Sequence, residues 1–147
     1  MKENRLYVNE LVNPVFGGKN VIEQFRDLGY NVTHHSRSVV FGQHGHTCIG
    51  QIDLLICCGD VEILVEVYDA LRNTSVLDHI ERLKTYRNYV DAEGRGDNRR
   101  FIGAVAGAVI EGDATDVAIE NGMYVIVQSG ESVEIVTPPE GFVTKEW

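Results

Sequence analysis

Hydrophobic and polar residues alternate most regularly between Gly50 and Tyr68. Two runs of mostly aliphatic residues flank the pair Gly59-Asp60, which is typical of the tight turn of a β-hairpin. If these two residues form the turn, residues that face each other across the hairpin have numbers that add up to 119. Side chains alternate between the two faces of a strand, so one face carries six aliphatic residues. They are Ile52, Leu54, Ile56, Ile63, Val65 and Val67.

The other face of this predicted hairpin carries a pair of carboxylates. Asp53 lies directly opposite Glu66, and Gln51 lies opposite Tyr68. Two facing carboxylates repel each other unless a shared proton or a bound divalent cation offsets the repulsion. The common alternative is an exposed sheet face with two solvated acids, and the register alone leaves both interpretations open.

The remaining pattern predicts helices and strands in alternation. Residues 6–28 have a helical apolar stripe that Pro14 and Gly17-Gly18 interrupt, so this region is either two helices or one bent helix that Gly29 ends. Residues 31–41 form a strand before the hairpin. After the hairpin come a helix at 74–90, a buried strand at 101–110, a helix at 113–121 and strands at 123–128 and 132–136.

This order predicts one α/β domain over residues 1–147. Its order is αβββαβαβ, and its mixed sheet has helices on both faces. A chain of 147 residues with 44% hydrophobic and 24% charged residues has the composition of an ordinary globular domain.

Composition and charge make some classes of protein function less probable for this chain than others. No apolar run has the length of a membrane span, and the first five residues do not form a signal peptide, so we expect no membrane association. Three cysteines, two of them adjacent at Cys57 and Cys58, give no disulfide framework and favour the cytoplasm. The net charge of −9 disfavours nucleic-acid binding except where basic residues gather, as at Arg95, Arg99 and Arg100.

A second candidate site lies in the turn before the hairpin. His44, His46 and Cys48 alternate and can share one face there, as zinc ligands do. Their spacing matches no standard structural zinc site, which favours polar residues on an exposed turn.

The order helix, antiparallel meander, helix, strand, with an aspartate on the second strand and a glutamate on the third, resembles the PD-(D/E)XK nuclease superfamily. The matching segments are residues 50–53 and 65–68, and residues 103–109, 122–130, 139–142 and 146–147 resemble a group of bacterial proteins of that superfamily. The resemblance implies a restriction-endonuclease-like core. It also implies that Asp53 and Glu66 hold Mg²⁺ or Mn²⁺ for DNA cleavage, with Glu23 or Gln24 on the first helix as an additional ligand.

The chain departs from this family at Tyr68. The family has a lysine there, whose charge stabilises the transferring phosphate, and tyrosine has a hydroxyl without a positive charge. Gln51 likewise stands where relatives often have glutamate. Either a basic residue at another position of the chain replaces this lysine, or catalysis has been lost. Lys84 is the first candidate for such a residue and Arg72 is the second.

Two function hypotheses of different classes follow. The first is a divalent-metal-dependent DNA phosphodiesterase with Asp53, Glu66, Tyr68 and Lys84 in its catalytic site. The second is a catalytically inactive module with a nuclease-like fold that binds a protein partner or a second copy of itself. Tyr68 and the negative net charge favour the second.

Overall fold

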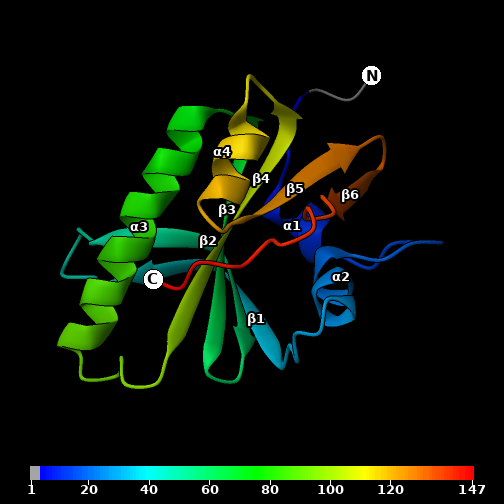
Figure 1. Ribbon diagram of the computed structural model, residues 1–147. Coiled ribbons are helices and arrows are strands. Elements are labelled where there is room, and N and C mark those ends of the chain that lie inside the picture. Colours follow the sequence, from blue (N-terminus) through cyan, green and yellow to red (C-terminus); the bar gives the residue numbers. More distant parts are fainter. Residues whose placement is uncertain (1–3) are drawn as a thin grey trace.

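The computed structural model describes residues 4–147, which form four helices and one six-stranded sheet (Figure 1). The elements in chain order are α1 (Val8–Val12), α2 (Val21–Asp27), β1 (His34–Phe41), β2 (Gly50–Cys58), β3 (Val61–Leu71), α3 (Asn73–Ala92), β4 (Arg100–Ile110), α4 (Ala114–Glu120), β5 (Tyr124–Ser129) and β6 (Ser132–Ile135). No helix within residues 4–147 is long and apolar enough to cross a membrane.

The sheet is mixed, and its strands lie in sequence order from β1 to β6. Strands β1, β2 and β3 form an antiparallel meander, β3, β4 and β5 are parallel, and β6 returns antiparallel to β5. The two parallel connections contain α3 and α4, as crossover helices require. The α/β class and the mixed sheet are therefore as the sequence predicts.

The N-terminal helical region consists of two separate helices. Helix α1 ends at Val12, just before Pro14, and α2 begins after Asn20. Asn20 and Glu23 form a capping box, in which each side chain accepts a hydrogen bond from the other residue's backbone N–H. Gly29 follows α2 with φ = +102°, a conformation that favours glycine and ends the helix.

The register of the β2–β3 hairpin is the predicted one. Cys58 pairs with Val61 across a turn that contains Gly59, at φ = +68°, and the ladder continues to Leu54 and Val65. These paired numbers all add up to 119. Beyond Leu54 and Val65 the regular pairing ends, and β2 separates from β3 while β1 stays paired with β2.

The prediction of one unbroken apolar face was wrong, because Ile52 lies in the core on the opposite face of the sheet from the other five residues. Leu54 and Val65 belong to the core under α1 and α2, whereas Ile52 belongs to the core under α3 and α4. The change of face occurs at Asp53, where β2 no longer pairs with β3 and where Ser38 of β1 adopts φ = +52°. Helices thus cover both faces, as expected, and the carboxylate face is a second core.

Phe101 of β4 is at the centre of the core under α3. Its side chain is fully buried, its ring centroid lies 5.0 Å from that of Tyr86, and the Arg87 guanidinium lies 4.1 Å from the ring centroid. We expect Phe101→Ala to lower the free energy of unfolding by about 3–5 kcal/mol, measured by urea denaturation. Val143→Ala, at a side chain that is 79% exposed, is the control and should change it by less than about 0.5 kcal/mol.

Candidate active site

The predicted carboxylate pair lies where β2 and β3 separate. Asp53 and Glu66 are the first residues of the two strands beyond the last regular pair. The Asp53 carboxylate accepts a hydrogen bond from the backbone N–H of Val67 (2.9 Å), and Glu66 Oε1 accepts one from the backbone N–H of Asp53 (3.3 Å). Each carboxylate therefore reaches across to the opposite strand, and the structure brings the two together.

Glu66 is the buried member of the pair. Its residue is only 6% exposed, whereas Asp53 is half-buried. Burial, and next the negative charge of Asp53, raise the pKa of Glu66 to about 8, although the Arg82 guanidinium acts in the opposite direction. Without a bound cation, Glu66 therefore keeps a proton at neutral pH, which removes most of the repulsion between the two groups.

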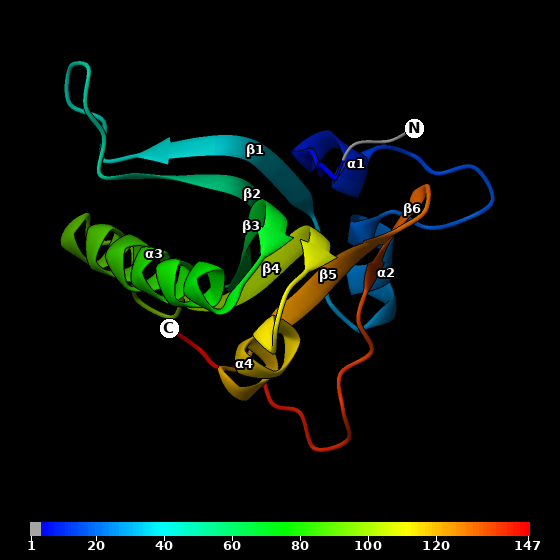
Figure 2. The ribbon, with the colours of Figure 1, turned by 90° about the horizontal axis from the view of Figure 1, so that it is seen from above.

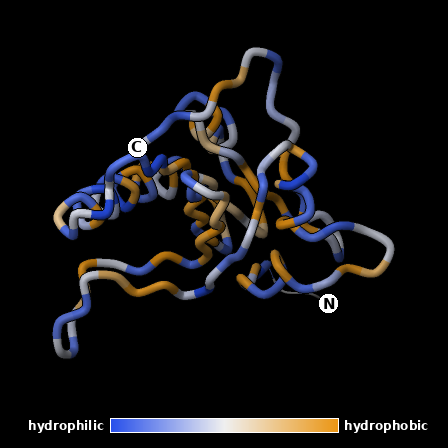
Figure 3. The backbone as a smooth tube through the Cα atoms, turned by 90° about the horizontal axis from the view of Figure 1, so that it is seen from below, coloured by the Kyte–Doolittle hydropathy of each residue, from blue (hydrophilic) through white to orange (hydrophobic). Residues whose placement is uncertain are grey.

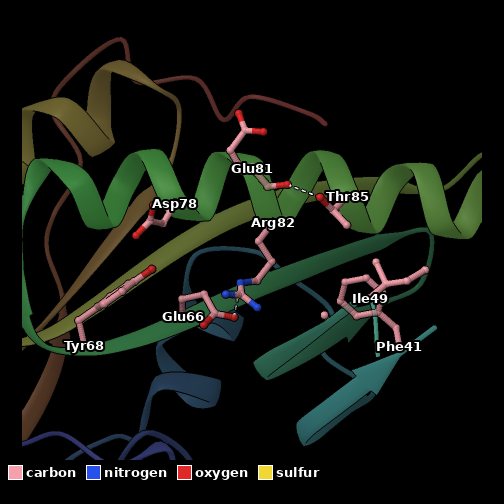
Figure 4. A pocket seen from close by; sticks show the side chains of 9 residues that line it. Phe41, Ile49, Glu66, Tyr68, Asp78, Glu81, Arg82 and Thr85 are labelled. Atoms are coloured by element: carbon pink, nitrogen blue, oxygen red, sulfur yellow. Dashed lines mark hydrogen bonds and ion pairs between the residues drawn. The ribbon is translucent and has the colours of Figure 1, made fainter. Parts of the chain in front are cut away.

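Arg82 of α3 is the cation nearest to this pair in the described part of the chain. Its guanidinium points at the Glu66 carboxyl group (Figure 4), with Nε 3.2 Å from Glu66 Oε1. Its Nη1 donates a hydrogen bond to the backbone carbonyl of Gln51. The guanidinium thus connects the separated ends of β2 and β3. The sequence interpretation missed this residue.

A signal for Arg82 is present in the sequence. Ser75, His79, Arg82 and Tyr86 follow one another at spacings of three and four residues, which places them on one face of α3. Ser75, His79 and Tyr86 are buried, and the Arg82 side chain is 31% exposed. A charged residue in such a mostly buried stripe is a candidate partner for a buried acid.

The other residues proposed for the site lie elsewhere. Lys84 is exposed and pairs with Glu81 of the same helix at 3.7 Å, and Arg72 pairs with Glu111 at 2.6 Å, also on the surface. Glu23 caps α2, which packs against the opposite face of the sheet from α3. The structure therefore does not bring Lys84, Arg72 or Glu23 to the carboxylate pair.

Tyr68 lies beside the pair, at the position where the resembled family has lysine. Its hydroxyl donates a hydrogen bond to the backbone carbonyl of Ser75 (3.2 Å). Burial is the main reason that its pKa is raised to about 12, and the neighbouring Glu66 adds to the shift. Tyr68 is therefore a neutral hydroxyl at physiological pH and neither a base nor a cation.

An open cavity of about 390 Å³ lies beside the carboxylate pair, and of the two carboxylates only Glu66 is among its lining residues. Glu66, Tyr68 and Arg82 contribute to its wall, together with residues of β1, the β1–β2 connection, β2 and α3 (Figure 4). These other residues are Phe41, Ile49, Gly50, Asp78, Glu81 and Thr85. Its lining thus includes one cation, two hydroxyls and three acids.

His79 attaches α3 to the sheet next to the site. It is completely buried, and its Nε2 lies 2.9 Å from the backbone carbonyl of Leu64, to which it donates a hydrogen bond. Burial lowers its pKa to about 4, so the ring is neutral at pH 7. This bond fixes α3 against β3. From this position Arg82, one turn further along the helix, reaches Glu66.

The site offers a metal ion two carboxylates and no closed set of ligands. No three His, Cys, Asp or Glu side chains within residues 4–147 converge to form a closed metal cage, and this includes His44, His46 and Cys48. Magnesium commonly uses only one or two carboxylates, with water and substrate phosphate as its other ligands. Asp53 and Glu66 provide such a pair, and a cation would offset the repulsion that raises the pKa of Glu66.

Comparison with known proteins adds no family to this description. No protein-family model, no curated protein and no solved structure matches the chain.

Proposed function

We propose that this chain is a divalent-metal-dependent DNA phosphodiesterase in which Arg82 supplies the positive charge that the PD-(D/E)XK family takes from lysine. The observation that carries this proposal is the position of the Arg82 guanidinium, 3.2 Å from the buried Glu66 of the Asp53–Glu66 pair. We therefore assign the role of the family's lysine to Arg82, which lies beside the pair, and not to Lys84, which pairs with Glu81.

The arrangement of the elements supports this proposal. An N-terminal helical region is followed by an antiparallel meander, a helix and a parallel strand, which is the order that the resemblance implies. The acidic residues lie on the second and third strands of the meander, at the point where these strands separate. A restriction-endonuclease-like core is therefore part of the proposal.

The side chains divide the chemistry between them. Asp53 and Glu66 would hold Mg²⁺ or Mn²⁺, and this ion, when bound, polarises the phosphate and lowers the pKa of an attacking water. Arg82 has a planar set of N–H donors that matches two phosphate oxygens, and its charge stabilises the transition state. The Tyr68 side chain lines the same cavity, but its hydroxyl already donates its proton to the Ser75 carbonyl. It can therefore accept a hydrogen bond from a water, and it supplies no charge.

The inactive module remains the second candidate, and one observation favours it. Asp78 and Glu81 line the same cavity as Arg82, and the chain has a net charge of −9, so a phosphate must approach against negative charge. In that case the contact between the Arg82 guanidinium and the Glu66 carboxyl group is a structural bridge between α3 and β3. The cavity face would then bind a protein partner or a second copy of the chain.

A cleavage assay separates the two candidates. The purified chain is incubated with supercoiled plasmid and linear duplex DNA in Mg²⁺, in Mn²⁺ and in EDTA. The phosphodiesterase should cut in at least one metal and not in EDTA, and Asp53→Asn should be inactive while it unfolds at the same temperature as the wild type in EDTA. A wild type that cuts in neither metal would overturn the proposal in favour of the inactive module.

A further inference from the structure

Residues 28–52 of this acidic chain contain no aspartate or glutamate. The chain has 22 aspartates and glutamates in 147 residues, but none between Asp27 and Asp53. About four would be expected there at the average frequency of the chain. The segment contains instead one arginine, Arg37, and four of the five histidines. Such a segment repels a polyanion less than the acidic remainder of the chain does.

This segment includes a protruding β-ribbon, residues 38–52, which we call the arm. The arm comprises the last residues of β1, the connection at 42–49 and the first residues of β2, beyond the point where β2 stops pairing with β3. It extends away from the main body of the sheet, with the connection at its tip (Figure 2). Hydrophilic and neutral residues predominate at the tip (Figure 3), and β1 forms an edge of the sheet.

The last pair of the arm before its tip packs beside the candidate active site. Phe41 is only 4% exposed, and its ring centroid lies 5.2 Å from that of Tyr86 and 5.4 Å from that of Tyr89, both on α3. Gly50 allows the Phe41 ring to lie close to the backbone of β2, because a Cβ there would be 2.6 Å from the ring. Phe41, Ile49 and Gly50 also line the cavity that contains Glu66 and Arg82, so the tip projects from the edge of that cavity.

We propose that the arm inserts into the major groove of double-stranded DNA and thereby brings the adjacent backbone to the cavity. This inference rests on the proposed function and names its substrate as duplex DNA. A two-stranded antiparallel ribbon fits the B-form major groove, which is about 12 Å wide. The exposed side chains at the tip carry donors and acceptors that suit base edges. They are Gln43, His44, His46 and Thr47.

The backbone of the tip is held in one conformation. His44 and Thr47 form an isolated antiparallel bridge with hydrogen bonds of 2.8 and 3.1 Å between their backbones, and the Thr47 hydroxyl donates to the His44 carbonyl at 2.9 Å. Gly42 and Gly45 adopt φ of +65° and +64°, which suits the turns at the tip. A tip ordered in this way loses little conformational entropy when it binds.

Other partners fit the arm less well. A protein strand that adds to the β1 edge would need a regular row of N–H and C=O groups, and Ser38 at φ = +52° beside the charged Arg37 interrupts that row. Single strands are usually bound by stacking on aromatic residues, and the arm's one Phe, Tyr or Trp, Phe41, is buried. Duplex RNA has a deep, narrow major groove that excludes a ribbon.

Binding measurements without metal test the proposal apart from catalysis. Fluorescence anisotropy in EDTA at low salt compares a labelled 20-base-pair DNA duplex with the RNA duplex of the same sequence and with one DNA strand. We expect the wild type to bind the DNA duplex at least ten-fold more tightly than the RNA duplex. The double variant Gln43→Glu/His46→Glu, at two exposed tip residues, should bind the DNA duplex at least ten-fold more weakly than the wild type.

The matched control is Lys19→Glu, which also makes the chain more negative by two charges. Lys19 is exposed and precedes α2, next to residues of β6 at the opposite edge of the sheet from the arm. The affinity of Lys19→Glu for the DNA duplex should therefore fall by less than about two-fold. Equal loss in the control and the arm variant would overturn the proposal, as would equal affinity for the two duplexes or no binding at all.

The two proposals fail in different ways. If the wild type cleaves DNA and the arm variant binds and cleaves as well as the wild type, the arm proposal is wrong and the phosphodiesterase stands. If the wild type binds duplex DNA through the arm but cleaves nothing in either metal, the arm proposal stands and the proposed catalysis is wrong.

Discussion

Replacing Arg82 by alanine is expected to lower the rate of metal-dependent DNA cleavage by about 10²–10³-fold, the typical effect of removing one preorganised donor from a transition state. The reason is that, within residues 4–147, Arg82 is the only cationic side chain that lines the cavity. Arg82→Lys keeps the charge but loses the planar set of donors, so it should retain part of the activity. The measurement is the single-turnover rate on duplex DNA in saturating Mg²⁺ or Mn²⁺.

Lys84→Ala is the matched control for Arg82→Ala. It removes one positive charge from the same helix two residues further on, at a side chain that is 56% exposed and pairs with Glu81. Its rate should stay within about two-fold of the wild type, because an exposed ion pair contributes little. If Lys84→Ala abolishes cleavage and Arg82→Ala does not, the cation assignment from the structure is wrong and the one made from the sequence is right.

The carboxylate pair could be predicted from the sequence because a two-residue turn determines which residues face each other. Gly59-Asp60 sets the register, and the register places Asp53 and Glu66 opposite each other without any knowledge of the rest of the fold. The separation of the strands beyond Leu54 could not be predicted in this way. It depends on how β1 and β2 together bend away from β3, and the local pattern does not contain that information.

The sequence interpretation named Lys84 as the cation near the carboxylate pair, whereas the structure places Arg82 there, and the reason is related. The helix at α3 was predicted, but two candidate faces, one with Lys84 and one with Arg82, differ by a rotation of the helix about its axis. That rotation is set by tertiary contacts such as the bond from His79 to Leu64 and the packing of Tyr86 on Phe41 and Phe101. Glu23 was misplaced similarly, since its role in capping α2 is visible in the sequence but the face of the sheet that α2 covers is not.

Glu66 should make the protein less stable as the pH rises in metal-free buffer. Its pKa is about 8 in the folded protein and about 4.5 when unfolded, so the folded state holds a proton that the unfolded state releases between these values. The contribution of this proton to stability is complete below pH 4.5 and is lost as the pH rises to 8. His79 acts in the opposite sense, because its pKa falls from 6.5 to about 4 on folding and its cost appears only below pH 6.5.

Between pH 6.5 and pH 8, the change of stability with pH therefore reports on Glu66 and not on His79. In EDTA the melting temperature of the wild type should fall across this window, and that of Glu66→Gln, which has no proton to lose, should change much less. The control is Glu62→Gln, at another buried glutamate of β3 that pairs with Arg99 at 2.5 Å, and it should keep the slope of the wild type.

If Asp53 and Glu66 bind Mg²⁺, the stabilisation that the metal provides should increase with pH, whereas the stability of the metal-free protein decreases. A divalent cation requires the ionised carboxylate, so binding expels the proton from Glu66 and becomes tighter as the pH rises. The gain in melting temperature at 5–10 mM Mg²⁺, an order of magnitude suited to weak carboxylate sites, should thus be larger at pH 8 than at pH 6.5 and absent in Glu66→Gln. A gain that is equal at both pH values, or that persists in Glu66→Gln, would show that magnesium binds elsewhere. The buried pair would then be a proton-sharing element of the core, because a proton on Glu66 and the guanidinium of Arg82 together already offset its charge.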